Sequence, residues 1–157
     1  MHSPVESVWD YPRPPRVEPS TEHIVVTHRG FVIAETTASF RVLETSHPPT
    51  YYLPFDCVDW QYVETVAGST WCEFKGAASY ADIVVGSSRI ARAIWWYPSP
   101  ATGYEMLADH LSLYPGKVDS VTVAGEEVQA QEGDFYGGWI TSRVRGPFKG
   151  APGTAGW

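Results

Sequence analysis

The chain has 157 residues, of which 43% are hydrophobic and 14% aromatic, and its formal net charge is −7. This length suffices for one globular domain with its own core, and the aromatic content excludes a disordered chain. Only 11 residues are Lys or Arg, so we expect no nucleic acid partner and no anionic membrane surface, both of which need a basic face.

No apolar run approaches the roughly 18 residues that cross a bilayer, and the first residues, MHSPVESVWDYPRPPR, lack the apolar segment of a secretory signal. We therefore expect a cytoplasmic protein. Its two cysteines, Cys57 and Cys72, are then expected to be free thiols. Because they form no C-x-x-C pair, neither a structural zinc site nor another cofactor is predicted.

Residues 1–22 are predicted to form an extended N-terminal arm, because five prolines between positions 4 and 19 disfavour a helix or a central strand. Val8, Trp9 and Tyr11 are too apolar for a free tail. We expect these side chains to hold the arm on the domain. Residues 131–157 are predicted to be a similar C-terminal arm, since Gly and Pro alternate there with Trp139 and Trp157.

Residues 23–130 are predicted to form an all-β domain of about nine antiparallel strands. β-Branched runs that flank a turn dipeptide indicate hairpins over 23–35, 79–97 and 118–129. Further strands are expected over 38–45, 50–53, 58–63 and 70–74. One short helix is expected after Thr102, because Thr102 and Glu105 have the spacing of a capping box.

Candidate chemistry is densest in two segments, RVLETSHPPTYYLP at 41–54 and WCEFKGAASY at 71–80. Glu44 ends a strand, and His47 begins a loop that two prolines make stiff, so polar side chains are expected at one rim. A carboxylate near a histidine can fix its tautomer and produce a general base. The alternative is structural: Glu44 pairs with Arg41 or Lys75, and His47 caps the turn.

Cys72 and Lys75 lie three residues apart, and a thiolate beside an ammonium is a nucleophile. We favour a buried, inert thiol, as is usual for a lone cysteine. Lys75 precedes Gly76 at a strand break, where the backbone can approach a ligand, so it is expected to supply positive charge. Two or three of the aromatic residues in and near these segments could line a pocket, but the main role expected for the set is core packing. The set is Trp71, Tyr80, Trp95, Trp96 and Tyr97.

The chain resembles an uncharacterised bacterial and fungal family called domain of unknown function (DUF) 427. The resemblance is carried by RVLETSHPPTYYLP (41–54), CEFKGAASY (72–80), AIWWYPSP (93–100) and DHLSLYPGKVD (109–119), and by the terminal segments VWDYPRPPR (8–16), FYGGWIT and GPFKGAPGTAGW (within 135–157). It implies a small, mainly antiparallel, two-sheet domain, tent-like or barrel-like, with one short helix and extended terminal arms.

Such a fold is similar to the superfamily of methionine-R-sulfoxide reductases and the cereblon ligand-binding domain. Those relatives hold zinc on two cysteine pairs, which this chain lacks, so neither zinc nor reductase activity is carried over. A nucleotidyltransferase label used for the family has no support here either, because paired catalytic carboxylates on a Gly-Ser motif are absent.

We expect a pocket that binds a small organic molecule, and the predicted ligand-binding residues are Glu44, His47, Tyr51, Tyr52, Lys75, Ser79, Tyr80 and Trp96. Glu44 is expected to accept hydrogen bonds or act as a base, Lys75 to supply charge, and Trp96 to form an apolar wall. Two alternatives stay open. One is an enzyme that uses Glu44 or His47 as general base, and the other is an interaction module whose aromatic arms form a homodimer.

Overall fold

The computed structural model describes residues 4–72, 74–132, 137–150, 153–154 and 157. Within these ranges the elements are strands and single 3-10 turns, which confirms the all-β fold class. None of the helical turns described is long and apolar enough to cross a membrane.

The short helix expected after Thr102 is a single 3-10 turn, η4 (Glu105–Leu107). The Glu105 carboxylate accepts a hydrogen bond from the backbone NH of Gly103, at 2.9 Å, and not from that of Thr102. The capping box is therefore not formed. Ala108 is extended, and the chain then enters a strand at His110.

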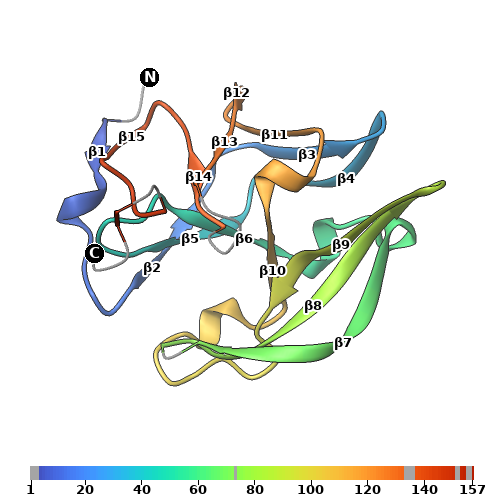
Figure 1. The fold of residues 1–157 in the computed structure, drawn as a ribbon, viewed down its shortest axis with the longest axis horizontal. Coiled ribbons are helices and arrows are strands. Elements are labelled where there is room, and N and C mark those ends of the chain that lie inside the picture. Colours follow the sequence, from blue (N-terminus) through green and yellow to red (C-terminus); the bar gives the residue numbers. More distant parts are fainter. Residues whose placement is uncertain (1–3, 73, 133–136, 151–152, 155–156) are drawn as a thin grey trace.

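Seven strands form the larger sheet, in the order β2-β5-β6-β10-β9-β8-β7. They are β2 (Arg16–Ser20), β5 (Ser39–Leu43), β6 (Thr50–Pro54), β10 (His110–Leu113), β9 (Ser88–Trp96), β8 (Gly76–Val85) and β7 (Val63–Cys72). All neighbours in this sheet are antiparallel. Because β2 and β7 are its two edges, the sheet is open and forms no closed barrel (Figure 1).

A four-stranded sheet has the order β12-β11-β3-β4. Its strands are β3 (Ile24–His28), β4 (Phe31–Thr36), β11 (Ser120–Val123) and β12 (Glu126–Glu127). Two short pairs complete the fold: β1 (Glu6–Ser7) runs parallel to β15 (Val144–Arg145), and β13 (Gln129–Ala130) runs antiparallel to β14 (Trp139–Ile140). The other 3-10 turns are η1 (Val8–Asp10), η2 (Phe55–Cys57), η3 (Trp60–Tyr62) and η5 (Pro115–Lys117).

Side-chain alternation gives the seven-stranded sheet two different faces. One face contributes Leu53, Ile83 and Ile94 to the larger core, which they share with Ile24 and Val26 of the four-stranded sheet. The opposite face carries a smaller, aromatic core: Val42, Tyr52, Ala78, Trp95, Tyr97, Tyr104 and Leu107. Thus Tyr51 and Tyr52, adjacent on β6 and each only 2% exposed, belong to different cores.

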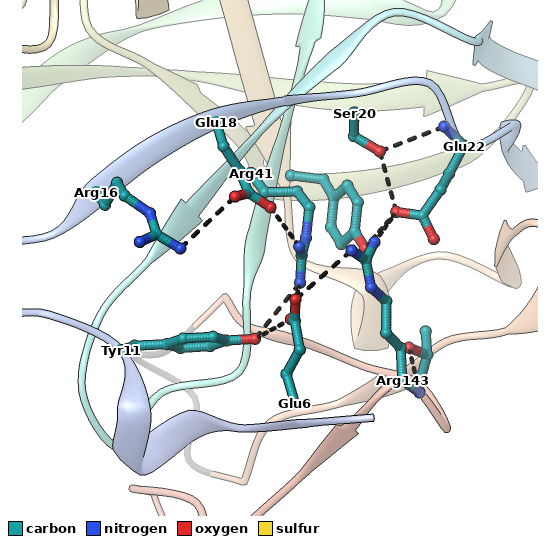
Figure 2. A network of polar contacts seen from close by, with 10 residues as sticks. Glu6, Tyr11, Arg16, Glu18, Ser20, Glu22, Arg41 and Arg143 are labelled. Carbon is teal, nitrogen blue, oxygen red and sulfur yellow. Dashed lines mark hydrogen bonds and ion pairs between the residues drawn. The ribbon is translucent and has the colours of Figure 1, made fainter. Parts of the chain in front are cut away.

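Both termini are attached to β5 by a group of polar side chains, here called the arm clasp and shown in Figure 2: Glu6, Tyr11, Glu18, Glu22, Arg41 and Arg143. Arg41 donates hydrogen bonds to Glu6, at 2.7 Å, and to Glu18, at 2.6 Å. Arg143 donates to Glu22, at 2.7 Å, and forms an ion pair with Glu6, at 3.6 Å. Glu6 therefore joins the N-terminal segment both to β5 and to the C-terminal segment.

Aromatic side chains also fix the terminal segments. Trp9 donates its indole NH to the Pro147 carbonyl, at 2.8 Å, and its ring meets that of Trp157 edge-on, with centroids 5.2 Å apart. Trp139 is 1% exposed and stacks on Tyr51, with centroids 5.0 Å apart. The paired strands β1 and β15 lie at the side of the molecule away from the long β7–β9 strands (Figure 1).

Candidate functional site

A cavity of about 320 Å³, here called the aromatic pocket, opens on the face of the seven-stranded sheet that carries the aromatic core. This volume lies at the lower end of the range for small-molecule sites. Its walls come from segments far apart in the sequence, and the lining residues are Glu44, His47, Thr50, Tyr52, Thr70, Trp71, Cys72, Lys75, Ala78, Tyr80, Trp95, Tyr97, Tyr114, Gln131, Gly137 and Gly138.

The structure brings together five of the eight predicted ligand-binding residues in this pocket: Glu44, His47, Tyr52, Lys75 and Tyr80. The remaining three are Tyr51, Ser79 and Trp96. Tyr51 faces the larger core, and Trp96 packs against the same core. Ser79 pairs with Trp96 across β8 and β9 and therefore shares its face.

The apolar wall expected from Trp96 is formed instead by Trp95 and Tyr97. These two side chains lie on the face opposite to Trp96, as alternation along β9 requires. The Trp95 indole NH donates to the Tyr52 hydroxyl, at 3.0 Å, which fixes both rings against each other. The rings meet edge-on, with centroids 6.2 Å apart.

Lys75 brings a positive charge into this aromatic surrounding. It lies in the turn between β7 and β8, where Gly76 adopts a φ of 104°, a conformation that glycine reaches without steric cost. The Lys75 ammonium lies 5.9 Å from the centre of the Tyr97 ring. Burial alone would lower the pKa of Lys75, but the surrounding Tyr52, Cys72 and Glu44 raise it above its ordinary value.

Two phenols near this ammonium, Tyr52 and Tyr97, are protonated at neutral pH and hydrogen-bonded to each other. Burial raises the pKa of Tyr52, and burial together with contacts to Tyr52 and Cys72 raises the pKa of Tyr97. Both phenols therefore keep their protons. Among the residues that the structure describes, none forms an ion pair with Lys75; Glu44 acts on its ammonium through the electrostatic field, and Cys72 through a hydrogen bond.

Glu44 and His47 line the same pocket. Glu44 forms an ion pair with Arg13 of the N-terminal segment, at 3.5 Å, and its carboxylate lies 3.9 Å from His47 Nδ1. The structural alternative considered from the sequence is thus wrong only in the partner of Glu44, which is Arg13 and not Arg41 or Lys75, since Arg41 pairs with Glu6 and Glu18.

His47 Nδ1 lies 2.9 Å from the Thr45 carbonyl oxygen. Because a carbonyl only accepts, Nδ1 must carry the proton, and the basic nitrogen of the neutral ring is Nε2. Burial lowers the pKa of His47, which favours this neutral form.

Cys72 is half-buried and lines the pocket beside Lys75. Cys57 is also a free thiol, and burial raises its pKa to about 11. The described part of the chain contains no group of three or more His, Cys, Asp or Glu side chains placed to hold a metal ion.

Sequence reasoning missed the contribution of the C-terminal segment. Gln131, Gly137 and Gly138 line the pocket, although they are distant in sequence from the two segments singled out. The Gly-Gly pair before a tryptophan was the available signal, since adjacent glycines permit close approach of the backbone. Residues 135 and 136 of the FYGGWIT motif lie outside the described residues.

One family model matches the chain, over residues 16–124, and is described as Domain of unknown function (DUF427), with the short name NTP_transf_9. The matched segment is well over half of the chain. It begins at β2 and ends after β11, so it includes the strands beneath the pocket but not its C-terminal wall. Comparison with curated proteins found none that matches.

Proposed function

The chain belongs to the DUF427 family, and from its pocket we propose that it binds a small aromatic organic anion whose negative group meets Lys75. The observation that carries the proposal is the Lys75 ammonium itself, which lines an aromatic cavity without an ion pair to any described residue. A partly buried charge is costly unless a partner compensates it. A carboxylate on the ligand would supply that partner, and the hydroxyl of the Tyr52–Tyr97 pair whose proton is not used between the two phenols would donate to its second oxygen.

The shape of the pocket supports an aromatic body for this ligand. Tyr52, Tyr80, Trp95 and Tyr97 provide ring surfaces, and aromatic rings pack favourably edge-on or offset. The volume of about 320 Å³ favours one or two fused rings over a larger cofactor.

Lys75 is proposed to act as an electrostatic anchor and not as an amine nucleophile. A lysine that forms a Schiff base needs a lowered pKa, because the attacking amine must be unprotonated. The pKa of Lys75 is raised, so the ammonium persists at neutral pH. A noncovalent, charge-assisted hydrogen bond is therefore the interaction expected with the ligand.

A second candidate function is catalysis with His47 as general base. It is favoured by the tautomer of His47, whose basic nitrogen is Nε2, and by the position of the ring in the same pocket as the Lys75 ammonium. A base and a cation in one cavity could remove a proton from a ligand and stabilise the anion that results. If a bound ligand slowly exchanges its acidic C–H protons for deuterium in D₂O, and His47→Asn abolishes this exchange, the result would support this function.

The proposed function is tested with three probes of similar shape: benzoate, benzamide and benzylamine. Calorimetric titration should show that benzoate binds at least about tenfold more tightly than neutral benzamide, because a charge-assisted hydrogen bond contributes on the order of 1.5–3 kcal/mol. In Lys75→Met this preference should disappear. The matched control is Lys117→Met, which also removes a lysine lying over a tyrosine ring; that ring, Tyr114, lines the pocket, but Lys117 itself does not.

Preference for benzylamine, or equal binding of all three probes, would contradict an anion site. If Lys117→Met abolished the preference for benzoate as completely as Lys75→Met, the effect would come from net charge and not from the pocket.

A further inference from the structure

We infer that the C-terminal residues Gln131, Gly137 and Gly138 set the size of ligand that the aromatic pocket accepts. This inference rests on the proposed function. The three residues lie beyond the segment that the family model matches, yet they form one wall of the cavity. The pocket therefore has two parts: a charged end built by the family domain and a wall added by the terminal segment.

Gln131 holds this wall in place. Its side chain is buried, with the residue only 5% exposed. The Gln131 Oε1 atom accepts a hydrogen bond from the Gly138 backbone NH, at 3.1 Å, and Nε2 donates to the Lys149 carbonyl, at 2.6 Å. The side chain thus spans two stretches of the terminal segment, and a buried amide satisfied on both sides has little freedom to reorient.

The two glycines bring the backbone closer to the pocket than any other residue could. A Cβ added at Gly137 would lie 2.3 Å from Cη2 of Trp95, and one at Gly138 would lie 2.4 Å from Cγ of Pro48. Both distances are shorter than nonbonded carbon atoms tolerate. Main-chain atoms therefore form the wall itself, directly against the ring of Trp95.

Trp139 prevents this wall from retreating. It follows the glycines, stacks on Tyr51 and donates its indole NH to the Leu113 carbonyl, at 3.2 Å. Its backbone NH also donates to the Pro49 carbonyl, at 2.8 Å. Since the anchor lies in the larger core, the glycine backbone is held in contact with the Trp95 ring and closes this side of the pocket, so a bound ring system cannot extend past it.

Two substitutions test the inference, one expected to narrow the aromatic pocket and one expected to widen it. Each is measured with two probes of different size, benzoate and 2-naphthoate. Gly137→Ala adds a methyl group against Trp95 and should weaken 2-naphthoate at least about fivefold more than benzoate. Gln131→Ala removes four heavy atoms from the wall and should shift the preference toward 2-naphthoate, by about threefold. The matched control is Gly116→Ala, at a glycine near Ala130 that lies outside the pocket lining.

Calorimetric dissociation constants are measured for each protein, and thermal unfolding without ligand shows whether each variant is folded. If Gly137→Ala does not fold, Gln131→Ala carries the test alone. An unchanged ratio of the two dissociation constants in the folded variants, with benzoate still bound through Lys75, would overturn the inference and leave the proposed function intact. If the wild-type protein binds neither carboxylate, the proposed function fails, and this inference fails with it.

Discussion

Replacing Arg41 with methionine is expected to destabilise the protein by about 3 kcal/mol. Arg41 is 1% exposed, and its guanidinium donates to both Glu6 and Glu18. Methionine fills part of the space but removes the Arg41 hydrogen bonds from two carboxylates, which leaves Glu6 with Arg143 and Tyr11, and Glu18 with Arg16. Breaking a buried ion pair costs about 3–5 kcal/mol, and the lower end applies because the side chains of Glu6 and Glu18 are 28% and 32% exposed and can regain some hydration.

The destabilisation caused by Arg41→Met should depend on pH, and its direction follows from the pKa of Glu6. Burial alone would raise the pKa of Glu6, but hydrogen bonds from Arg41 and Tyr11 lower it below the ordinary value of 4.5. Between these two pKa values the unfolded chain binds more protons than the folded one. The stabilisation from Glu6 is therefore complete above about pH 4.5 and is lost as the pH falls through the folded-state value.

Urea unfolding followed by tryptophan fluorescence measures this effect, at neutral pH and at about pH 3, for the wild type, Arg41→Met, Glu6→Gln and the double variant. The difference between wild type and Arg41→Met should shrink in acid, and the coupling between the two sites should shrink with it. An equal cost at both pH values would refute the reasoning, because Arg41 would then stabilise the fold through packing alone.

Three further changes can be predicted from buried side chains. Trp139→Ala should cost about 3–5 kcal/mol in urea unfolding, since the indole is 1% exposed and stacked on Tyr51; a cost below about 1 kcal/mol would show that the segment is not anchored there. Cys57 should react slowly with iodoacetamide at neutral pH, because burial raises the pKa of its thiol to about 11, and peptide mapping that found rapid labelling would contradict this burial. Burial raises the pKa of Tyr97, so its phenol should not ionise near the ordinary value of 10.0. An absorbance titration of Tyr97→Phe should therefore show the same change near that pH as the wild type, and a smaller change would contradict the buried position.

Local sequence chemistry was sufficient to predict the hairpins. Arg29 and Gly30 turn β3 into β4 with φ values of 53° and 81°, and Ala124-Gly125 turns β11 into β12 in the same manner. The proline-locked loop after Glu44 and the strand break at Lys75 also meet at one cavity, as expected. These features depend on residues close together in the chain, which is why the sequence alone could indicate them.

The sequence could not show which face of the seven-stranded sheet carries the pocket. Alternation separates Trp95 from Trp96 and Tyr51 from Tyr52, but it does not say which face the second sheet will cover. The four-stranded sheet covers the face of Tyr51 and Trp96, so the pocket forms on the other. Likewise no local pattern pairs Arg41 with Glu6, which is 35 positions away and meets it only after the N-terminal segment has packed.

Strand β6 connects the arm clasp with the pocket. Arg41 lies over the ring of Tyr51, at 5.9 Å, and Tyr51 stacks on Trp139, which anchors the glycine wall. The next residue on the strand, Tyr52, points to the opposite face and lines the pocket. Because closely packed side chains transmit displacement, loss of the clasp should loosen this wall while Lys75, which lies in the β7–β8 turn, keeps its surroundings. Under the proposed function, the charge of the pocket and its width are then controlled by different parts of the fold, so changes in the terminal segments would alter ligand size without altering the lysine proposed to bind the anion.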